Sequence, residues 1–217
     1  MESDAADAVA ARMLQAARDL DAAGLEAALD EAFGSARFEV AAERVVMPAL
    51  RAIGDAWERG EISVAGEHAA SHAVLRRLAM AYEAAAAADG DRPVLVGLGP
   101  GSRHELGALA FAVAARRAGV PVLYLGPDLP AESWTAAAVG RDARAAVIGV
   151  ATRADARRAN EVVLALREAR PNLVMAAGGL EARRVATAVD VLELPPSIPG
   201  AVNALVARIE AANSGGG

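Results

Sequence analysis

His104 is the residue whose type and position most directly suggest chemistry. It lies in the segment Gly99-Pro100-Gly101-Ser102-Arg103-His104-Glu105-Leu106-Gly107, directly after the apolar run 93–98. That run is typical of a buried parallel strand, and residues 105–118 are typical of the helix that follows it. Open α/β sheets bind ligands outside the carboxyl ends of their strands, and imidazole is a good ligand for a transition metal. We therefore predict a binding site around His104, where the glycines let the backbone lie close to something large and flat.

Three further loops follow predicted strands and should lie at the same edge of the sheet. They are residues 126–130, Ala151-Thr152 and Gly178-Gly179. The glycine pair removes two side chains at a point where a ligand could enter. Together with the His104 loop, these segments predict a long slot lined by backbone.

Two other interpretations of the His104 loop remain open. The stretch Gly97-Leu98-Gly99-Pro100-Gly101-Ser102 begins like a dinucleotide fingerprint, with Ser102 at the position of the third glycine and Asp128 as the acidic ribose contact. A nucleotide-binding or adaptor domain is thus an alternative. A histidine at the start of a helix can also simply hydrogen-bond locally.

No acid–base pair for catalysis is visible in the sequence. Glu105, Asp128 and Asp155 are interpreted as solvated residues of loops or helix starts. We therefore do not expect the chain to be an enzyme.

Composition excludes several classes of chemistry. The chain has 217 residues and no cysteine, and all 22 of its basic residues are arginine. Disulfides, thiolate metal sites, cysteine nucleophiles, Schiff-base chemistry and a Walker lysine are therefore excluded.

The net charge of -6 argues against a polyanion partner. The acidic start and the absence of a long apolar run predict no signal peptide, no membrane contact and a cytoplasmic location.

The first part of the chain has the period of amphipathic helices. We predict helices over residues 5–20, 25–33, 38–57 and 64–87, with a break at Gly24 and a kink or break at Pro48. Ser63 is the predicted N-cap of the last helix. Short connections between the helices indicate a four-helix bundle over residues 1–88.

After a linker at residues 88–93 the period changes. Apolar runs at 93–98, 121–125, 145–150, 173–177 and 189–192 alternate with helical stretches. This alternation predicts a flavodoxin-like (Rossmann-like) domain over residues 92–212, with a five-stranded parallel sheet covered on both faces. Residues 213–217 are predicted to be a disordered tail. The fold class is α + α/β.

The second domain resembles a known family through His104-x-x-Gly107 and the later Gly178-Gly179. The pattern is similar to the cobalamin-binding Rossmann-like domain, whose motif is Asp-x-His-x-x-Gly. The resemblance implies that His104 replaces the cofactor's own base as lower axial ligand of cobalt. It also implies that Gly107 lets the displaced nucleotide tail pass and that Gly178 and Gly179 flank its far end. Ser102, Arg103 and Thr152 complete the predicted cofactor contacts. The family's motif aspartate is Ser102 here, which removes a carboxylate that would hold the histidine.

The helical domain carries a second signature, Trp57 and Val64 followed by Glu67-His68. It resembles the bundle of the CarH-type, MerR-associated photoreceptor regulators, which implies adenosylcobalamin as cofactor. Trp57 and Val64 would form an apolar roof over the adenosyl group, and Glu67 and His68 would contact its polar atoms. The alternative is that Trp57 and Val64 are core residues, while Glu67 and His68 are solvated.

One departure from this family affects the predicted upper ligand. The family's histidine next to the tryptophan, which binds cobalt from above after light, is Glu58 here. His68 or His72, four residues apart on one helical face, are the remaining candidates, although His72 is also interpreted as a partly buried histidine between helices.

The sequence also shows no basic recognition helix, so we expect no direct DNA binding by this chain. The predicted function is an adenosylcobalamin-binding light sensor that signals through loss of the adenosyl group and a change in homo-oligomer or in contacts with a protein regulator. The alternative is the corrinoid methyl carrier of a methyltransferase system.

Overall fold

The computed structural model describes residues 3–85, 92–185 and 190–214. The chain separates into two compact units, Met1–Ala81 and Tyr82–Gly217. The predicted linker at 88–93 lies mostly outside the described residues, so the predicted domain limits at 88 and 92 stay predictions. No helix among the described residues is long and apolar enough to cross a membrane.

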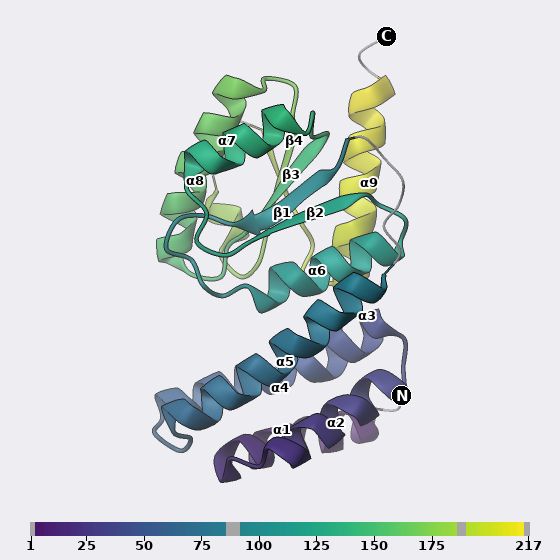
Figure 1. Ribbon diagram of the computed structural model, residues 1–217, viewed down its shortest axis with the longest axis vertical. Helices are drawn as coiled ribbons and strands as arrows, with labels where there is room; N and C mark the ends of the chain where they lie inside the picture. Colours follow the sequence, from purple (N-terminus) through teal and green to yellow (C-terminus); the bar gives the residue numbers. More distant parts are fainter. Residues whose placement is uncertain (1–2, 86–91, 186–189, 215–217) are drawn as a thin grey trace. The chain divides into compact units, whose positions relative to one another are not determined.

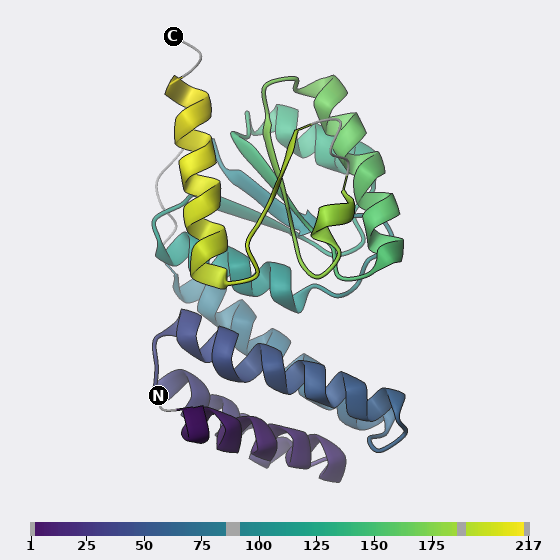
Figure 2. The same cartoon turned by 180° about the vertical axis from the view of Figure 1, so that it is seen from behind.

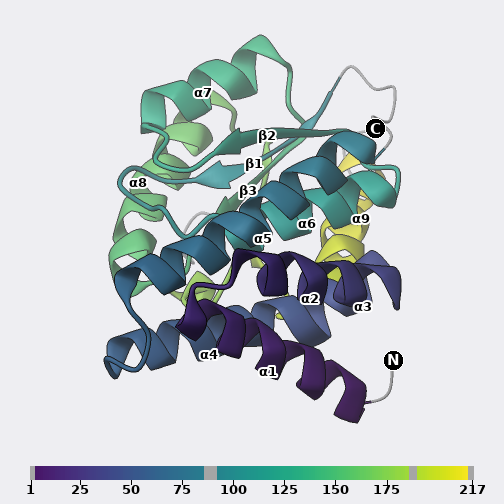
Figure 3. The same ribbon diagram turned by 60° about the horizontal axis from the view of Figure 1, so that its bottom comes forward.

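The first unit is helical, as predicted. Its elements are α1 (Ser3–Asp19), α2 (Ala22–Gly34), α3 (Phe38–Ala41), the π-helical turn η1 (Ala42–Val46), α4 (Met47–Glu58) and α5 (Val64–Ala84), whose last turn extends into the second unit. Figure 3 shows α1 alongside α2 and α4. The helices of this unit, α5 included, bury apolar side chains, among them Met13, Leu29, Ile53, Val74 and Leu78.

The predicted break at Gly24 is wrong, because Gly24 lies in the first turn of α2. The chain instead turns at Leu20, which has a φ of 55°. Asp21 then caps α2, and its side chain accepts a hydrogen bond from the Gly24 N–H at 3.0 Å. A glycine is tolerated at this position because the first-turn N–H groups have no partner within the helix and the cap supplies one.

The chain does not break at Pro48, as it stays helical from Phe38 to Glu58, but the helix type changes just before this residue. The backbone widens into the π-helical turn η1, and Pro48 lies in the first turn of α4 that follows. A proline has no N–H to donate and its ring clashes with the carbonyl of the preceding turn. The wider turn removes that conflict while the chain stays helical.

The second unit contains a five-stranded parallel sheet in the order β2-β1-β3-β4-β5. The strands are β1 (Val94–Leu98), β2 (Val122–Gly126), β3 (Ala145–Gly149), β4 (Val174–Gly178) and β5 (Val191–Glu193). The connecting helices are α6 (Leu106–Arg117), α7 (Ala131–Gly140), α8 (Arg153–Ala169) and α9 (Ile198–Ser214), with the 3₁₀ turn η2 (Ala182–Arg184) after β4. The predicted doubly wound fold is confirmed.

Helices cover both faces of this sheet, with α7 and α8 on one side and α6 and α9 on the other (Figures 1 and 2). Trp134 of α7 is fully buried against the first of these faces, and its indole N–H donates to the carbonyl of Leu98 at 3.4 Å. Helix α9 ends at Ser214, so the first two residues of the predicted tail, Asn213 and Ser214, are helical. The other three lie outside the described residues.

Candidate functional site

The His104 loop is fixed by hydrogen bonds within itself and to the loop after β2. The Ser102 N–H donates to the carbonyl of Gly99 at 3.1 Å, and the Ser102 carbonyl accepts from the Asp128 N–H at 3.0 Å. The Asp128 carboxylate in turn accepts from the N–H of Gly101. These contacts leave Arg103 and His104 exposed beyond the end of β1. Asp128 is thus an exposed loop residue, as predicted, that also holds the loop in shape.

The two predicted glycine positions differ in what surrounds them. Gly107, in the first turn of α6, has nothing within 4 Å of the place where a Cβ atom would be. Gly179 has a φ of +113°, and a Cβ there would be 2.4 Å from the carbonyl oxygen of Val150. Gly107 therefore faces open space, whereas Gly179 is required by the close approach of two backbones.

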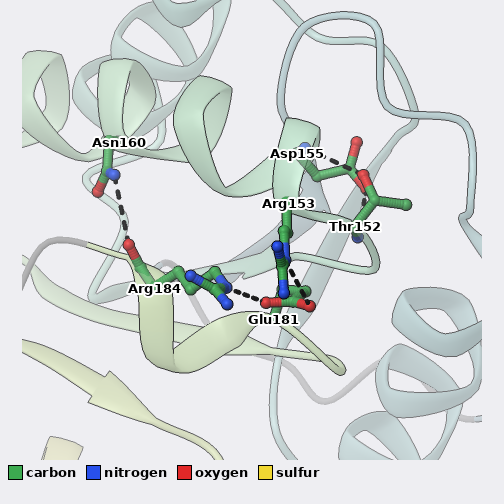
Figure 4. Close-up of polar contacts among 6 residues, drawn as sticks. All are labelled: Thr152, Arg153, Asp155, Asn160, Glu181 and Arg184. Carbon is green, nitrogen blue, oxygen red and sulfur yellow. Dashed lines mark hydrogen bonds and ion pairs between the residues drawn. The ribbon is translucent and has the colours of Figure 1, made fainter.

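The loop after β3 begins α8 with a capping box (Figure 4). The Thr152 hydroxyl donates to Asp155 Oδ2 at 2.8 Å and accepts from the Asp155 N–H at 3.2 Å, while the Thr152 N–H donates to the same Oδ2 at 2.8 Å. This reciprocal arrangement satisfies donors that a helix start otherwise leaves unpaired. The hydroxyl that was predicted to contact a cofactor is thereby engaged in the cap.

Asp155 is 5% exposed, so its interpretation as a solvated residue is wrong. Burial raises the pKa of this carboxyl, but hydrogen bonds from the Thr152 side chain and backbone lower it more. The nearby Ser102 hydroxyl and the charge of His104 lower the pKa further, so the net pKa is below the ordinary value. The carboxyl is therefore held in its charged form close to the His104 loop.

Ser102 is 1% exposed, and its Oγ makes no hydrogen bond of standard geometry with any described residue. A buried hydroxyl without a partner is costly and rare. Ser102 lies near enough to the Asp155 carboxylate to favour its charge. The hydroxyl is thus available to a group that arrives at the loop.

A set of ion pairs connects the β3–α8 loop to the segment after Gly178-Gly179 (Figure 4). Glu181 pairs with Arg153 at 3.9 Å and also with Arg184. The Val150 N–H donates to the Gly178 carbonyl at 2.8 Å, which extends the alignment of β3 and β4 beyond the strands. The loops after these two strands are therefore held side by side, as the sequence predicted.

Glu105, next to His104, is half-buried rather than fully solvated. Its carboxylate accepts a hydrogen bond from the hydroxyl of Tyr124 on β2 at 2.8 Å. Burial, followed by the hydrogen bond and charge of Glu105, raises the pKa of Tyr124. The phenol thus stays a donor and anchors the start of α6.

The signature in the helical unit lies at its surface. Trp57 is 45% and Val64 55% exposed, so the alternative that they are core residues is wrong. Glu67 Oε1 accepts from the Ser71 hydroxyl at 2.6 Å, and Glu67 Oε2 lies 3.6 Å from His68 Nε2. Exposed apolar and polar side chains in one unit are what the binding of a ligand with apolar and polar parts requires.

His68 and His72 share one face of α5, as their spacing predicted. Their ring centroids are 6.3 Å apart and their planes are nearly perpendicular. Both are exposed, which rules out the interpretation of His72 as a partly buried histidine between helices.

The predicted site residues therefore form two sets, each within one unit. Ser102, Arg103, His104, Gly107, Thr152, Gly178 and Gly179 belong to the carboxyl edge of the sheet, and Trp57, Val64, Glu67 and His68 belong to the end of α4 and the start of α5. The sequence interpretation missed Asp155 and Tyr124 as site residues. The pattern Thr152-x-x-Asp155 after a strand could have signalled the capping box, but no local pattern pairs Tyr124 with Glu105.

The residues at the sheet edge fit a large cofactor that brings its own metal. His104 offers one exposed imidazole, Gly107 faces open space, and the Ser102 hydroxyl is buried without a partner among the described residues. One nitrogen ligand with a polar group behind it suits a metal whose other ligands come from the cofactor.

Comparison with known protein families and solved structures agrees with this chemistry. Residues 9–82 match the family model described as a B12 binding domain. Two repressors of Myxococcus xanthus are similar in sequence: the HTH-type transcriptional repressor CarH is 33% identical over 79% of this chain and 57% of its own length, and the repressor CarA is 33% identical over 71% and 52%. The chain thus spans about half the length of these curated relatives.

Solved structures share the fold. The monomethylamine corrinoid protein of Methanosarcina barkeri has a TM-score of 0.71 at 15% identity, covering 90% of this chain and 96% of its own. A cobalamin-binding protein of Desulfitobacterium hafniense has a TM-score of 0.51 at 16% identity, covering 96% and 98%. Residues 9–82 thus match the B12 binding domain family, the chain is similar to two repressors over most of its own length, and the matched domain indicates a cobalamin or related corrinoid as cofactor.

Proposed function

We propose that this chain is an adenosylcobalamin-binding light sensor that signals to a protein regulator or to further copies of itself. The observation that carries the proposal is the exposed Trp57, Val64, Glu67 and His68 set in a chain that also presents His104 at a sheet edge. Similarity to the repressors CarH and CarA supports a regulatory role. A sensor of this kind would act in the cytoplasm.

The residues of the second unit would hold the lower side of the cofactor. His104 would donate an imidazole nitrogen to cobalt, and the loops at Gly107 and Gly178-Gly179 would border the nucleotide tail. The cofactor would supply a cobalt–carbon bond that light can break. The chain's own contribution is to bind, to orient the imidazole and to exclude water.

The residues of the first unit would select the upper ligand. Trp57 and Val64 offer apolar surface, and Glu67 and His68 offer an acceptor and a donor on one helix turn. A methyl group needs none of these, whereas an adenosyl group uses all of them. After loss of the adenosyl group, His68 or His72 would be the available upper ligand, since Glu58 replaces the family's histidine.

Reconstitution in darkness tests the proposal. The purified chain should bind adenosylcobalamin in the dark and change its absorption spectrum on illumination. His104→Ala should weaken binding by about tenfold or more, because the metal then keeps the cofactor's own base. A spectrum unchanged by light would refute the sensor function. Unaltered cobalamin binding by His104→Ala would refute His104 as the cobalt ligand.

Selection of the upper ligand can be tested separately. Trp57→Ala should raise the Kd for adenosylcobalamin by about 5- to 150-fold, which corresponds to the roughly 1–3 kcal/mol of a lost aromatic contact, and leave the Kd for methylcobalamin within about twofold. Leu20→Ala is a matched control, since Leu20 is 55% exposed in the same unit and lies outside the signature. Equal losses for the two cofactors would contradict the assigned role of Trp57.

A corrinoid methyl carrier is the second candidate. The likeness in fold to a monomethylamine corrinoid protein over nearly the whole chain favours it. Methyl transfer to the chain's bound cob(I)alamin, with turnover by a partner methyltransferase, would support this function over the sensor.

A further inference from the structure

A buried hydroxyl and a buried carboxylate follow two different strands of the sheet. Ser102 follows β1, and Asp155 lies in the first turn of α8 after β3. β1 and β3 are neighbours in the sheet, with Leu98 opposite Gly149 at their ends. The loops that continue from them therefore leave the sheet side by side.

Contacts of the glycines show how closely the two loops approach. A Cβ at Gly99 would be 3.5 Å from the N atom of Ala159, and one at Gly101 would be 2.6 Å from a guanidinium nitrogen of Arg158. The segment that leads to Ser102 thus lies directly on the first turns of α8. Helix α8 is also the helix whose first turn holds Asp155, so the Ser102 loop and the start of α8 lie close together.

The Asp155 carboxylate has one oxygen left for a further partner. Its hydrogen bonds from Thr152 both end on Oδ2, and the other oxygen points away from Thr152 in Figure 4. Ser102 Oγ is buried without a standard hydrogen bond among the described residues, and Ser102 comes two residues before His104 in the same loop. A hydroxyl can accept one hydrogen bond and donate another at once.

A histidine that binds a metal generally donates its second ring N–H to an acceptor, and this partner fixes the ring and raises the basicity of the ligating nitrogen. We infer that Asp155, acting through the Ser102 hydroxyl, is the positioning residue for His104: the ring N–H donates to Ser102 Oγ, and the Ser102 O–H donates to Asp155. The inference rests on the proposed role of His104 as cobalt ligand. The carboxylate that the motif lacks at Ser102 is then supplied by Asp155 from the first turn of α8.

Support also comes from the charge state of Asp155. The lowered pKa of this carboxyl includes contributions from Ser102 and from the charge of His104, after burial and the Thr152 hydrogen bonds. An anion held at this place favours the donor arrangement that the chain of hydrogen bonds needs.

Electron paramagnetic resonance of the cob(II)alamin-loaded, ¹⁵N-labelled chain tests the inference. A protein nitrogen on cobalt splits each line into a doublet, whereas the cofactor's own ¹⁴N base gives a triplet. We expect a doublet for the unaltered chain. Ser102→Ala and Asp155→Asn should each introduce the triplet and raise the Kd for cobalamin by about 10–100-fold.

The double variant Ser102→Asp with Asp155→Asn separates positioning from helix capping. It returns a carboxylate next to His104 without restoring Asp155, and should recover the doublet and most of the affinity. Asp21→Asn is the matched control, because Asp21 also caps a helix through its carboxylate, in the first unit. This variant should leave the spectrum unchanged.

Two outcomes would overturn different claims. A triplet in the unaltered chain would refute His104 as ligand and with it the proposed function. A doublet in the unaltered chain that persists in Ser102→Ala and Asp155→Asn would overturn only the positioning role. If Asp155→Asn failed to fold, Ser102→Ala, which removes no charge, would still decide the question.

Discussion

At the scale of single residues, small side chains explain more of this site than charged ones. Gly107 has open space where a side chain would be, and Gly179 has a backbone oxygen there. A side chain is therefore absent at the two positions for different physical reasons, although the two glycines look alike in the sequence. Substitution by alanine should distinguish them.

Gly179→Ala should lower the free energy of unfolding by roughly 1–3 kcal/mol, because a Cβ would meet the Val150 carbonyl and φ would be strained. Gly107→Ala should leave that free energy unchanged or slightly higher, since alanine favours a helix. Gly107→Ala should nevertheless weaken cobalamin binding, because its methyl group enters the space proposed for the nucleotide tail. Urea unfolding and cobalamin titration measure both effects. Equal unfolding curves for the two variants would contradict the difference between the glycines.

At the scale of elements, close helix packing and helix capping position the site residues. Gly66 lies in the first turn of α5, in the same segment as Val64, Glu67 and His68. A Cβ at Gly66 would be 2.3 Å from the carbonyl oxygen of Ala17 on α1. The start of α5 is therefore fixed by backbone contact with α1.

Gly66→Ala should lower the free energy of unfolding by about 1–3 kcal/mol through overpacking. Gly54→Ala is its control, because Gly54 lies inside α4 with nothing within 4 Å of a Cβ, and should raise that free energy by about 0.5–1 kcal/mol. Thermal unfolding followed by circular dichroism compares the pair. Stabilisation by both substitutions would show that the contact between α1 and α5 leaves room for a methyl group at residue 66.

The capping box of α8 makes stability depend on pH. Since the pKa of Asp155 is lowered in the folded chain, its charged form stabilises the fold above the unfolded pKa of about 4, and this contribution is lost as pH falls through the lower, folded pKa. Asp155→Asn removes the charge. The difference in unfolding free energy between the unaltered chain and this variant should therefore shrink from pH 7 towards pH 3, as measured by urea titration without cofactor. A difference that grew on acidification would contradict the lowered pKa.

At the scale of the whole molecule, the chain combines a helical unit and an α/β unit, each with a set of predicted ligand residues. Its surface charge is carried by arginine and carboxylates, with a net charge of -6. Guanidinium groups form bidentate contacts with carboxylates, which suits interfaces between proteins. A change of assembly is thus the output that we propose for the sensor.

The elution volume in gel filtration should differ between dark and illuminated samples loaded with adenosylcobalamin. Samples loaded with hydroxocobalamin, which has no adenosyl group to lose, should elute at the same volume in both conditions. A light-dependent change in the spectrum without any change in elution would move the output from self-assembly to a regulator protein.

The sequence by itself determined the type and order of the elements and the place of His104 at a strand end. Apolar periodicity is a local property, because burial of one helix face or of a whole strand constrains residues only a few positions apart. The glycine at 24 misled the prediction for a local reason too, since its effect depends on whether a capping side chain precedes it.

The tertiary structure decided which residues from separate strands meet. The approach of Asp155 to Ser102, the bond from Tyr124 to Glu105 and the exposure of Trp57 all depend on which elements become neighbours. Such contacts join residues about 20 to 50 positions apart, and the energy of each comes from desolvation and hydrogen bonding that exist only once the sheet has formed. No spacing along the chain encodes them.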